Sequence, residues 1–201
     1  MRDYKRLDKF LDQRALEIYP EPNGNLAVGI TKKMIPQIFE LYNIMPGARI
    51  LDVGCGNGFA LEIFRQMGCA PVGVCFGSDA EECRSKGFEI VETDMSFLNF
   101  EESRFDLIWC RHVLEHSILP YFTLCEMHRI LKPGGVFYIE VPAPGTSSSH
   151  ETNLNHYSVL TKKMWESLIL RAGFKISRPN TISFRTPEGP DEYYAFDGVR
   201  E

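Results

Sequence analysis

The chain has 201 residues, of which 44% are hydrophobic and 24% are charged, and its formal net charge is −5. This length suits one domain with a sizeable core, and the composition is that of an ordinary globular protein. The acidic balance argues against a general nucleic-acid surface, and no apolar run approaches the about 20 residues that cross a bilayer. The charged first residues lack the apolar core of a signal peptide, so we expect a cytoplasmic protein without a membrane segment.

The cysteine and histidine spacings do not indicate a metal site. No two of the six cysteines form a Cys-x-x-Cys pair, which disfavours a zinc ribbon or a thioredoxin-like site. His150, Glu151 and His156 do not have the His-Glu-x-x-His spacing of zinc proteases. We therefore expect no metal, and reduced thiols that are mostly buried.

The first 45 residues are predicted to form two amphipathic helices, over residues 3–18 and from Thr31 to Tyr42. The segment between them, residues 19–24, contains two prolines and a glycine and breaks the helical pattern. The first helix is as well suited to contact a substrate as to cover a sheet edge. For the second helix, packing against the sheet is the favoured interpretation.

A short apolar run from Ile50 to Val53 predicts a buried strand, and it ends in a glycine-rich turn that reaches Gly58. A helical pattern follows at once, so the helix N-terminus offers unpaired N–H groups to a polar or anionic ligand. The dinucleotide fingerprint Gly-x-Gly-x-x-Gly would require glycine at position 59, which is Phe59. A nicotinamide-dependent oxidoreductase is therefore a disfavoured alternative.

Strands alternate with helices beyond this turn, which implies right-handed crossovers and a parallel sheet. The later part of the chain contains a polar loop over residues 142–160, a helix over 162–172 and a closing β-hairpin. The other predicted strands lie at residues 70–75, 88–91, 104–110 and 136–141, and the other predicted helices at 59–67 and 78–84, with one ending at Leu131.

The glycine turn, Asp52-Val53-Gly54-Cys55-Gly56-Asn57-Gly58, resembles the first motif of the class I S-adenosylmethionine (SAM)-dependent methyltransferases. The similarity runs from about residue 46 to residue 178 and is closest to the ubiquinone-biosynthesis-like, small-molecule branch. The later segments that resemble the family in order and spacing are Phe105-Asp106-Leu107-Ile108, His112-Val113-Leu114-Glu115-His116, Arg129–Gly135 and Ala172-Gly173-Phe174.

The resemblance implies an α/β, Rossmann-like fold with a seven-stranded, mostly parallel sheet, helices on both faces and the last strand antiparallel. The cofactor should lie across the carboxyl ends of the first strands. Residues 46–201 would form the SAM-binding methyltransferase domain. Residues 1–45 would form a helical extension, which often acts as a lid in such enzymes.

The resemblance also implies the cofactor-binding residues. Gly54, Cys55 and Gly56 should pass beneath the methionine part of SAM, and Asp52 should bond to its amino group. Three further residues should hold the adenine: Asp94 through its carboxylate, Met95 through its backbone N–H and Phe76 through its ring. An alternative role for Asp94 is to cap a turn. Cys75 and Cys110, which end the second and fourth predicted strands, complete the set.

Cys75 departs from the family pattern, which has an acidic residue there to accept both ribose hydroxyls. A neutral thiol is a poor acceptor, and no carboxylate follows until Asp79. Each unreplaced charge-assisted hydrogen bond would cost about 1.5–3 kcal/mol. This departure motivates the alternative of a non-catalytic module that binds SAM or S-adenosylhomocysteine (SAH).

Methyl transfer mainly requires the protein to position the acceptor and exclude water, and a base only where the acceptor loses a proton. His116 after the fourth strand and His156 in the polar loop are the candidate bases, although each could instead be a packed or capping histidine. The Asn/Asp-Pro-Pro-Tyr motif of nucleic-acid methylation is absent, so we expect a small-molecule acceptor whose O, N or C atom is methylated.

Overall fold

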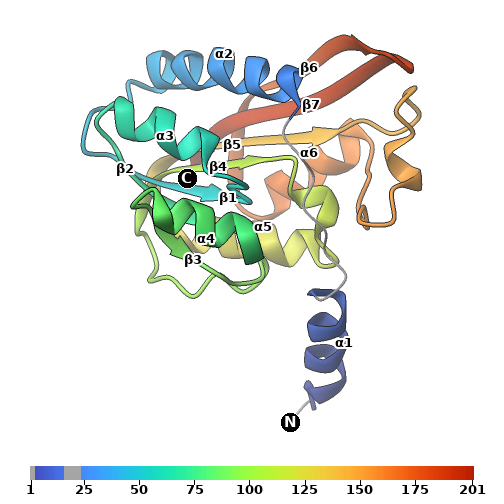
Figure 1. The fold of residues 1–201 in the computed structure, drawn as a ribbon, viewed down its shortest axis with the longest axis horizontal. Coiled ribbons are helices and arrows are strands. Elements are labelled where there is room, and N and C mark those ends of the chain that lie inside the picture. Colours follow the sequence, from blue (N-terminus) through green and yellow to red (C-terminus); the bar gives the residue numbers. More distant parts are fainter. Residues whose placement is uncertain (1–2, 16–23) are drawn as a thin grey trace.

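The structure, a computed structural model, describes residues 3–15 and 24–201. Among these residues, no helix is both long and apolar enough to cross a membrane. Figure 1 shows the elements, which are in chain order α1 (Lys5–Ala15), α2 (Asn25–Tyr42), β1 (Arg49–Val53), α3 (Phe59–Gln66), β2 (Ala70–Val74), α4 (Gly77–Ser85), β3 (Glu89–Val91), β4 (Phe105–Arg111), η1 (Leu114–His116), α5 (Pro120–Ile130), β5 (Leu131–Pro142), η2 (His150–Thr152), α6 (Lys162–Arg171), β6 (Phe174–Thr186) and β7 (Gly189–Arg200).

The strands form one seven-stranded sheet in the order β3-β2-β1-β4-β5-β7-β6. Strands β1 to β5 pair in parallel, and β7 lies antiparallel between β5 and β6. This confirms the predicted Rossmann-like sheet with its antiparallel last strand. The strand order reverses between β1 and β4, which is where open α/β sheets bind ligands.

Helices cover both faces of the sheet, as predicted (Figure 1). Leu107 and Trp109 of β4 pack in a cluster with residues of α2 and α3, whereas Ile108 and Cys110 pack in another with residues of α5 and α6. This alternation follows from the two-residue period of a strand. Burial on both faces explains why the strands are nearly continuous apolar runs in the sequence.

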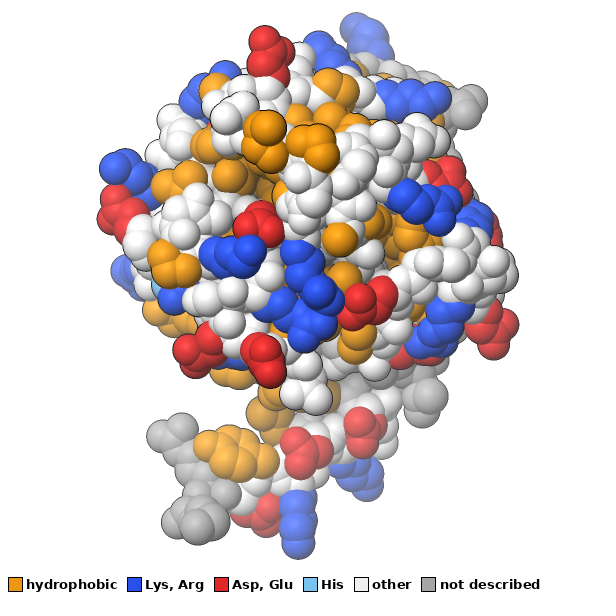
Figure 2. Space-filling model, turned by 90° about the vertical axis from the view of Figure 1, so that its left-hand side faces the viewer, with side chains coloured by type: hydrophobic (Ala, Val, Ile, Leu, Met, Phe, Trp, Pro, Cys, Tyr) orange, Lys and Arg blue, Asp and Glu red, His pale blue; other side chains and the backbone are white. Residues whose placement is uncertain are grey.

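The edge of the sheet where the strands begin carries mixed charges. Figure 2 shows basic and acidic side chains next to one another on this side of the molecule. Arg49 and Arg104 both pair with Glu89, with N–O distances of 3.3 and 3.5 Å, and Lys132 pairs with Asp106 at 2.7 Å. Such exposed ion pairs contribute little to the stability of the fold. Because each of these positive side chains lies next to a negative one, the two signs of charge are mixed along this edge of the sheet.

Two boundaries differ from the predicted ones. Helix α2 begins at Asn25, well before Thr31. Its N-cap residue is Gly24, which makes no side-chain cap, so no capping side chain marks this start in the sequence. Strand β5 begins at Leu131, before the predicted residue 136, and its first part contains an irregularity where the pairing with β4 shifts register. The predicted C-terminal end of the first helix, residues 16–18, lies outside the described residues.

Candidate active site

A cavity of about 780 Å³ lies at the carboxyl ends of β1, β2 and β4, at the point where the strand order reverses. The strand ends contribute Asp52, Cys75 and Arg111 to its wall, and Thr31 reaches it from α2. Its volume is within the range of about 300–1,000 Å³ that is usual for small-molecule sites. The cavity is therefore the candidate ligand site.

The glycine loop between β1 and α3 forms one side of this cavity, and its backbone is tied to β2. The N–H groups of Gly54 and Cys55 donate to the carbonyl of Val74 at 2.8 and 3.0 Å. Gly54 has φ +73°, and a Cβ atom there would lie 2.2 Å from Val113 Cγ2. Glycine is therefore required both by the backbone conformation and by the close approach. The first helical residue, Phe59, also lines the cavity.

Most of the predicted cofactor residues come together on this wall. Seven of them line the cavity: Asp52, Gly54, Cys55, Gly56, Cys75, Phe76 and Met95. Asp94 lines a small adjoining cavity of about 50 Å³, which Phe76 and Met95 also border. Its Oδ1 atom accepts from the N–H of Ser96 at 2.7 Å, the contact of a turn-capping aspartate. Cys110 is fully buried in the α5–α6 side of the core and is not part of the cavity wall.

Two carboxyl groups in the cavity wall are disfavoured in their charged form. Burial raises the pKa of Asp52 well above its usual value, and the nearby Cys75 adds to this, while Arg111 opposes it. Burial also raises the pKa of Asp79, which lines the cavity from the first turn of α4. Asp79 is thus a carboxyl group available to the cavity beside the position where Cys75 replaces an acid.

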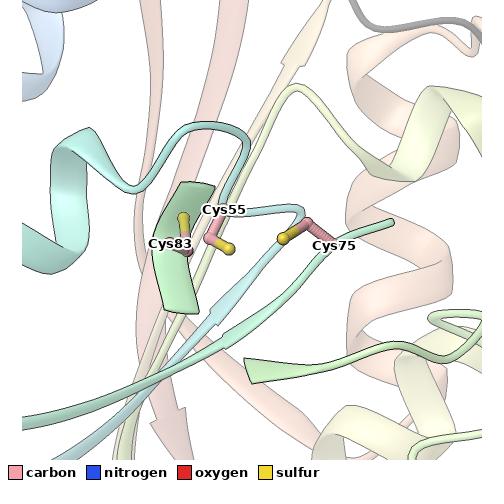
Figure 3. A group of neighbouring side chains, drawn as sticks. All are labelled: Cys55, Cys75 and Cys83. Carbon is pink, nitrogen blue, oxygen red and sulfur yellow. The ribbon is translucent and has the colours of Figure 1, made fainter. Parts of the chain in front are cut away.

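Cys75 belongs to a cluster of three thiols (Figure 3). The sulfur atoms of Cys55, Cys75 and Cys83 all lie within 4.8 Å of one another, and the Sγ atoms of Cys55 and Cys75 point toward each other. A Cβ atom on Gly73 would lie 2.5 Å from Cys55 Sγ, so the glycine makes room for the cluster. The hydrogen bond with Cys55 lowers the pKa of Cys75, whereas burial raises the pKa of Cys83 to about 11.

A buried charged network lies at the other end of the cavity. Glu140 is inaccessible to solvent, and its Oε1 atom lies 2.7 Å from Arg111 Nε and 3.0 Å from His112 Nε2. The second His112 nitrogen, Nδ1, lies 3.4 Å from Glu115. Although burial opposes its charged form, the hydrogen bonds to Glu115 and Glu140 raise the pKa of His112. The buried carboxylates are thus compensated by cations, as buried charges must be.

This network predicts a pH-dependent contribution to stability. Because the pKa of His112 is raised in the folded state, its contribution is present below about pH 6.5 and is lost as the pH rises through the folded pKa. The variant His112→Gln should lower the free energy of unfolding more at pH 6 than at pH 9, as measured by urea unfolding. Burial lowers the pKa of His128, so His128→Gln should show the opposite trend. A pH-independent effect of His112→Gln would contradict this prediction.

The two predicted bases lie together, but only one borders the large cavity. His116 lines it, and its Nδ1 atom lies 3.0 Å from the backbone carbonyl oxygen of Asn155. Because a carbonyl only accepts, this contact places the hydrogen on Nδ1 and the lone pair on Nε2. The ring of His156 packs edge-on against that of His116, with centroids 4.9 Å apart, and its Nδ1 contacts the carbonyl of His150. His156 is not among the residues that line the cavity.

Loop 143–161 is anchored beside this pair of histidines. The N–H groups of Tyr157 and Ser158 donate to the carbonyl of Glu115 at 2.8 and 2.9 Å. Asn155, within this loop, reaches the cavity wall. The loop therefore borders the candidate site through Asn155 and through the packing of His156 on His116.

Some residues of the wall, or in contact with it, were not singled out from the sequence. Arg111 follows the fourth predicted strand directly, and this position at the carboxyl edge of the sheet was the available signal. Glu140 is a charge inside an apolar strand, which indicates a buried partner. Tyr193 of β7 packs edge-on against His112, with centroids 4.1 Å apart, and no local pattern brings that strand to the cavity.

The doubly wound sheet, the glycine loop after β1 and the cavity at the switch point together define a class I SAM-dependent methyltransferase domain. Residues 51–139 match the family model described as "Methyltransferase domain". This segment thus carries the methyltransferase domain, and the cofactor of such domains is SAM. The assignment of SAM agrees with the spacing of the glycines, which disfavoured a nicotinamide cofactor.

Individual relatives are distant. The ubiquinone biosynthesis O-methyltransferase of Methylococcus capsulatus is 26% identical over 127 residues, which cover 59% of this chain and 54% of that protein. The demethylmenaquinone methyltransferase of Renibacterium salmoninarum is 26% identical over 169 residues, which cover 83% of this chain and 69% of that protein. This chain thus spans about half the length of the first of these relatives. A SAM-dependent methyltransferase from Archaeoglobus fulgidus has the same fold, with a TM-score of 0.70 and 19% sequence identity. The matched region covers 87% of this chain and 93% of that protein.

Proposed function

We propose that the chain transfers the methyl group of SAM to a small-molecule acceptor. The observation that carries this proposal is the continuity of the cavity, which extends from the glycine loop to His116 and Tyr193. At one end, the backbone of the glycine loop and the start of α3 are available to SAM. At the other end, polar side chains are available to an acceptor. The names of the quinone-methylating relatives support a small organic acceptor.

The residues at one end of the cavity would bind SAM, and those at the other end would act on the acceptor. SAM, when bound, supplies an electrophilic methyl group. Asp52 and the loop from Gly54 to Gly56 would hold the methionine part, and Phe76 and Met95 would hold the adenine. The Nε2 lone pair of His116 would take a proton from an acceptor that must lose one, and His156 would orient the His116 ring or contact the acceptor.

The N-terminal extension, residues 1–45, would cover the ligand cavity of the domain formed by residues 46–201. The first turns of α2 line the large cavity through Leu26, Ala27 and Thr31. Leu11 and Arg14 of α1 line the small adjoining cavity. A helix that packs on the sheet and also borders the cavity fits a wall of the acceptor site, with α1 as a cover.

A non-catalytic module that binds SAM or SAH is the second candidate, because Cys75 replaces the acid expected at the ribose. A thermal-shift comparison of SAM, SAH and NAD tests the shared part of both functions. We expect SAM and SAH to raise the melting temperature and NAD to leave it unchanged. Stabilisation by NAD alone would contradict both. Transfer of a labelled methyl group then separates the enzyme from the module.

The variant Cys75→Asp tests the ribose end. A carboxylate at this position should tighten SAH binding by about 1–3 kcal/mol, because it can accept from the ribose hydroxyls. Cys75→Ser is the matched control, since it supplies no charge. Calorimetric titration of both variants gives the comparison. An affinity for Cys75→Asp no better than that of Cys75→Ser would show that another group, such as Asp79, serves the ribose.

A further inference from the structure

We propose that Cys55, Cys75 and Cys83 form a binding site for a thiophilic d¹⁰ cation such as Zn²⁺ or Cd²⁺, and that this cation and SAM exclude each other. The site itself depends only on the three thiols. The exclusion rests in addition on the proposed use of the cavity by the cofactor.

The three sulfur atoms converge from three different elements (Figure 3). Cys55 belongs to the glycine loop, Cys75 follows β2 and Cys83 lies in α4, and all three are buried. Their sulfur atoms lie within 4.8 Å of one another. Zn–S bonds of about 2.3 Å in tetrahedral geometry place sulfur atoms about 3.8 Å apart. Small side-chain rotations therefore suffice to bring the three atoms to one ion.

The surroundings favour a soft ion with one exchangeable position. The three thiols release their protons to solvent when the ion binds, and the resulting thiolates select thiophilic cations over Mg²⁺ and Ca²⁺, which require oxygen ligands. Cys55 and Cys75 line the cavity, whereas Cys83 is not part of its wall. The fourth coordination position of a tetrahedral ion would therefore open toward the cavity, where water can occupy it.

The backbone around the cluster is suited to hold the thiols in place. Gly73 leaves the space that Cys55 Sγ occupies, because a Cβ atom there would approach it to 2.5 Å. The protonated thiol of Cys83 donates to the carbonyl of Gly56 at 3.2 Å, a contact that orients its sulfur atom and is given up when the thiol loses its proton. Each ligand comes from a separate segment, so the site has no Cys-x-x-Cys signature in the sequence.

Competition with the cofactor follows from the shared residues. Cys75 occupies the position where the family holds the ribose, and Cys55 belongs to the loop beneath the methionine part. An ion bound to these thiols, with its fourth ligand facing the cavity, would occupy the space of the ribose and so displace the cofactor. Because the two exclude each other, SAH should lower the apparent affinity of the cation in proportion to the concentration of SAH, and the cation should lower that of SAH in the same way.

The test is a titration of the reduced full chain with Cd²⁺ alone. Binding is monitored through the ultraviolet absorption of the cadmium–thiolate bonds. We expect one Cd²⁺ per chain, and an affinity at least about tenfold lower in Cys83→Ser and in Cys75→Ser. Cys125→Ser is the matched control, because Cys125 is a partly buried free thiol of α5 outside the cluster. Circular dichroism confirms that each variant is folded. Unchanged affinity in both cluster variants, or an equal loss in Cys125→Ser, would overturn the site.

A second titration with saturating SAH tests the exclusion. We expect the apparent Cd²⁺ affinity to fall further as the SAH concentration rises, and calorimetry of SAH to show a matching loss of SAH affinity as the Cd²⁺ concentration rises. Simultaneous binding at full affinity would overturn the exclusion. A chain that binds Cd²⁺ but not SAH would contradict the proposed function and leave the metal site standing.

Discussion

Gly56→Val is expected to abolish the binding of SAM and SAH while the chain remains folded. Gly56 lines the cavity with φ +49°, a backbone conformation that a β-branched residue adopts only with strain. The side chain would also occupy space beneath the methionine part of the cofactor. We expect the affinity for SAH, measured by calorimetry, to fall at least about 100-fold, equivalent to about 2.7 kcal/mol.

Gly134→Val is the control for this substitution. Gly134 also has a positive φ, +73°, and a Cβ atom there would meet nothing within 4 Å. It lies in β5 outside the cavity wall, so it carries backbone strain without contact with a ligand. Equal losses of SAH affinity in the two variants would mean that strain, and not occupation of the cavity, causes the effect.

His116→Ala is expected to lower turnover by about 10²–10⁴-fold for an acceptor that loses a proton, because a positioned base contributes that much. SAH affinity should stay within about twofold, since a residue that acts on the acceptor gives no differential binding to the cofactor. His156→Ala should also lower turnover, by a smaller factor if it acts through the ring of His116. The discriminating data are kcat and the dissociation constant of SAH on the same preparations.

The outcomes separate the roles of the two histidines. If SAH binding collapses together with turnover, the substituted histidine belongs to the cofactor site or to the fold. If neither constant changes, the histidine only packs in the loop. A pH profile adds a further criterion, because removal of a base should abolish the acidic limb of kcat, whereas a loss of packing should not.

Most of the fold could be predicted from the sequence, because its signals are local. The apolar runs fixed the strands from β1 to β5, and the glycine turn at Gly54–Gly58 placed the first crossover. The start of α2 could not be placed, since its N-cap residue Gly24 has no capping side chain and Gly29 lies within its first turns. The shift in register at the start of β5 depends on pairing with β4, which no local pattern encodes.

The site was predictable to the extent that strand ends determine it. Asp52, Gly54 and Cys75 line the cavity because the ends of β1 and β2 meet at one edge of the sheet. The thiol cluster was not predictable, since Cys83 reaches it from the interior of α4. Nor was the contact of Tyr193 with His112, which requires β7 to lie beside β5.

The most direct test of the proposed function is the fate of a labelled methyl group. The chain is incubated with methyl-labelled SAM and a cell extract, and the products are then separated into small molecules, protein and nucleic acid. We predict enzyme-dependent label in the small-molecule fraction, and none when Gly56→Val replaces the natural chain. Label confined to protein or nucleic acid, or no label in any fraction while SAM still binds, would contradict a small-molecule methyltransferase.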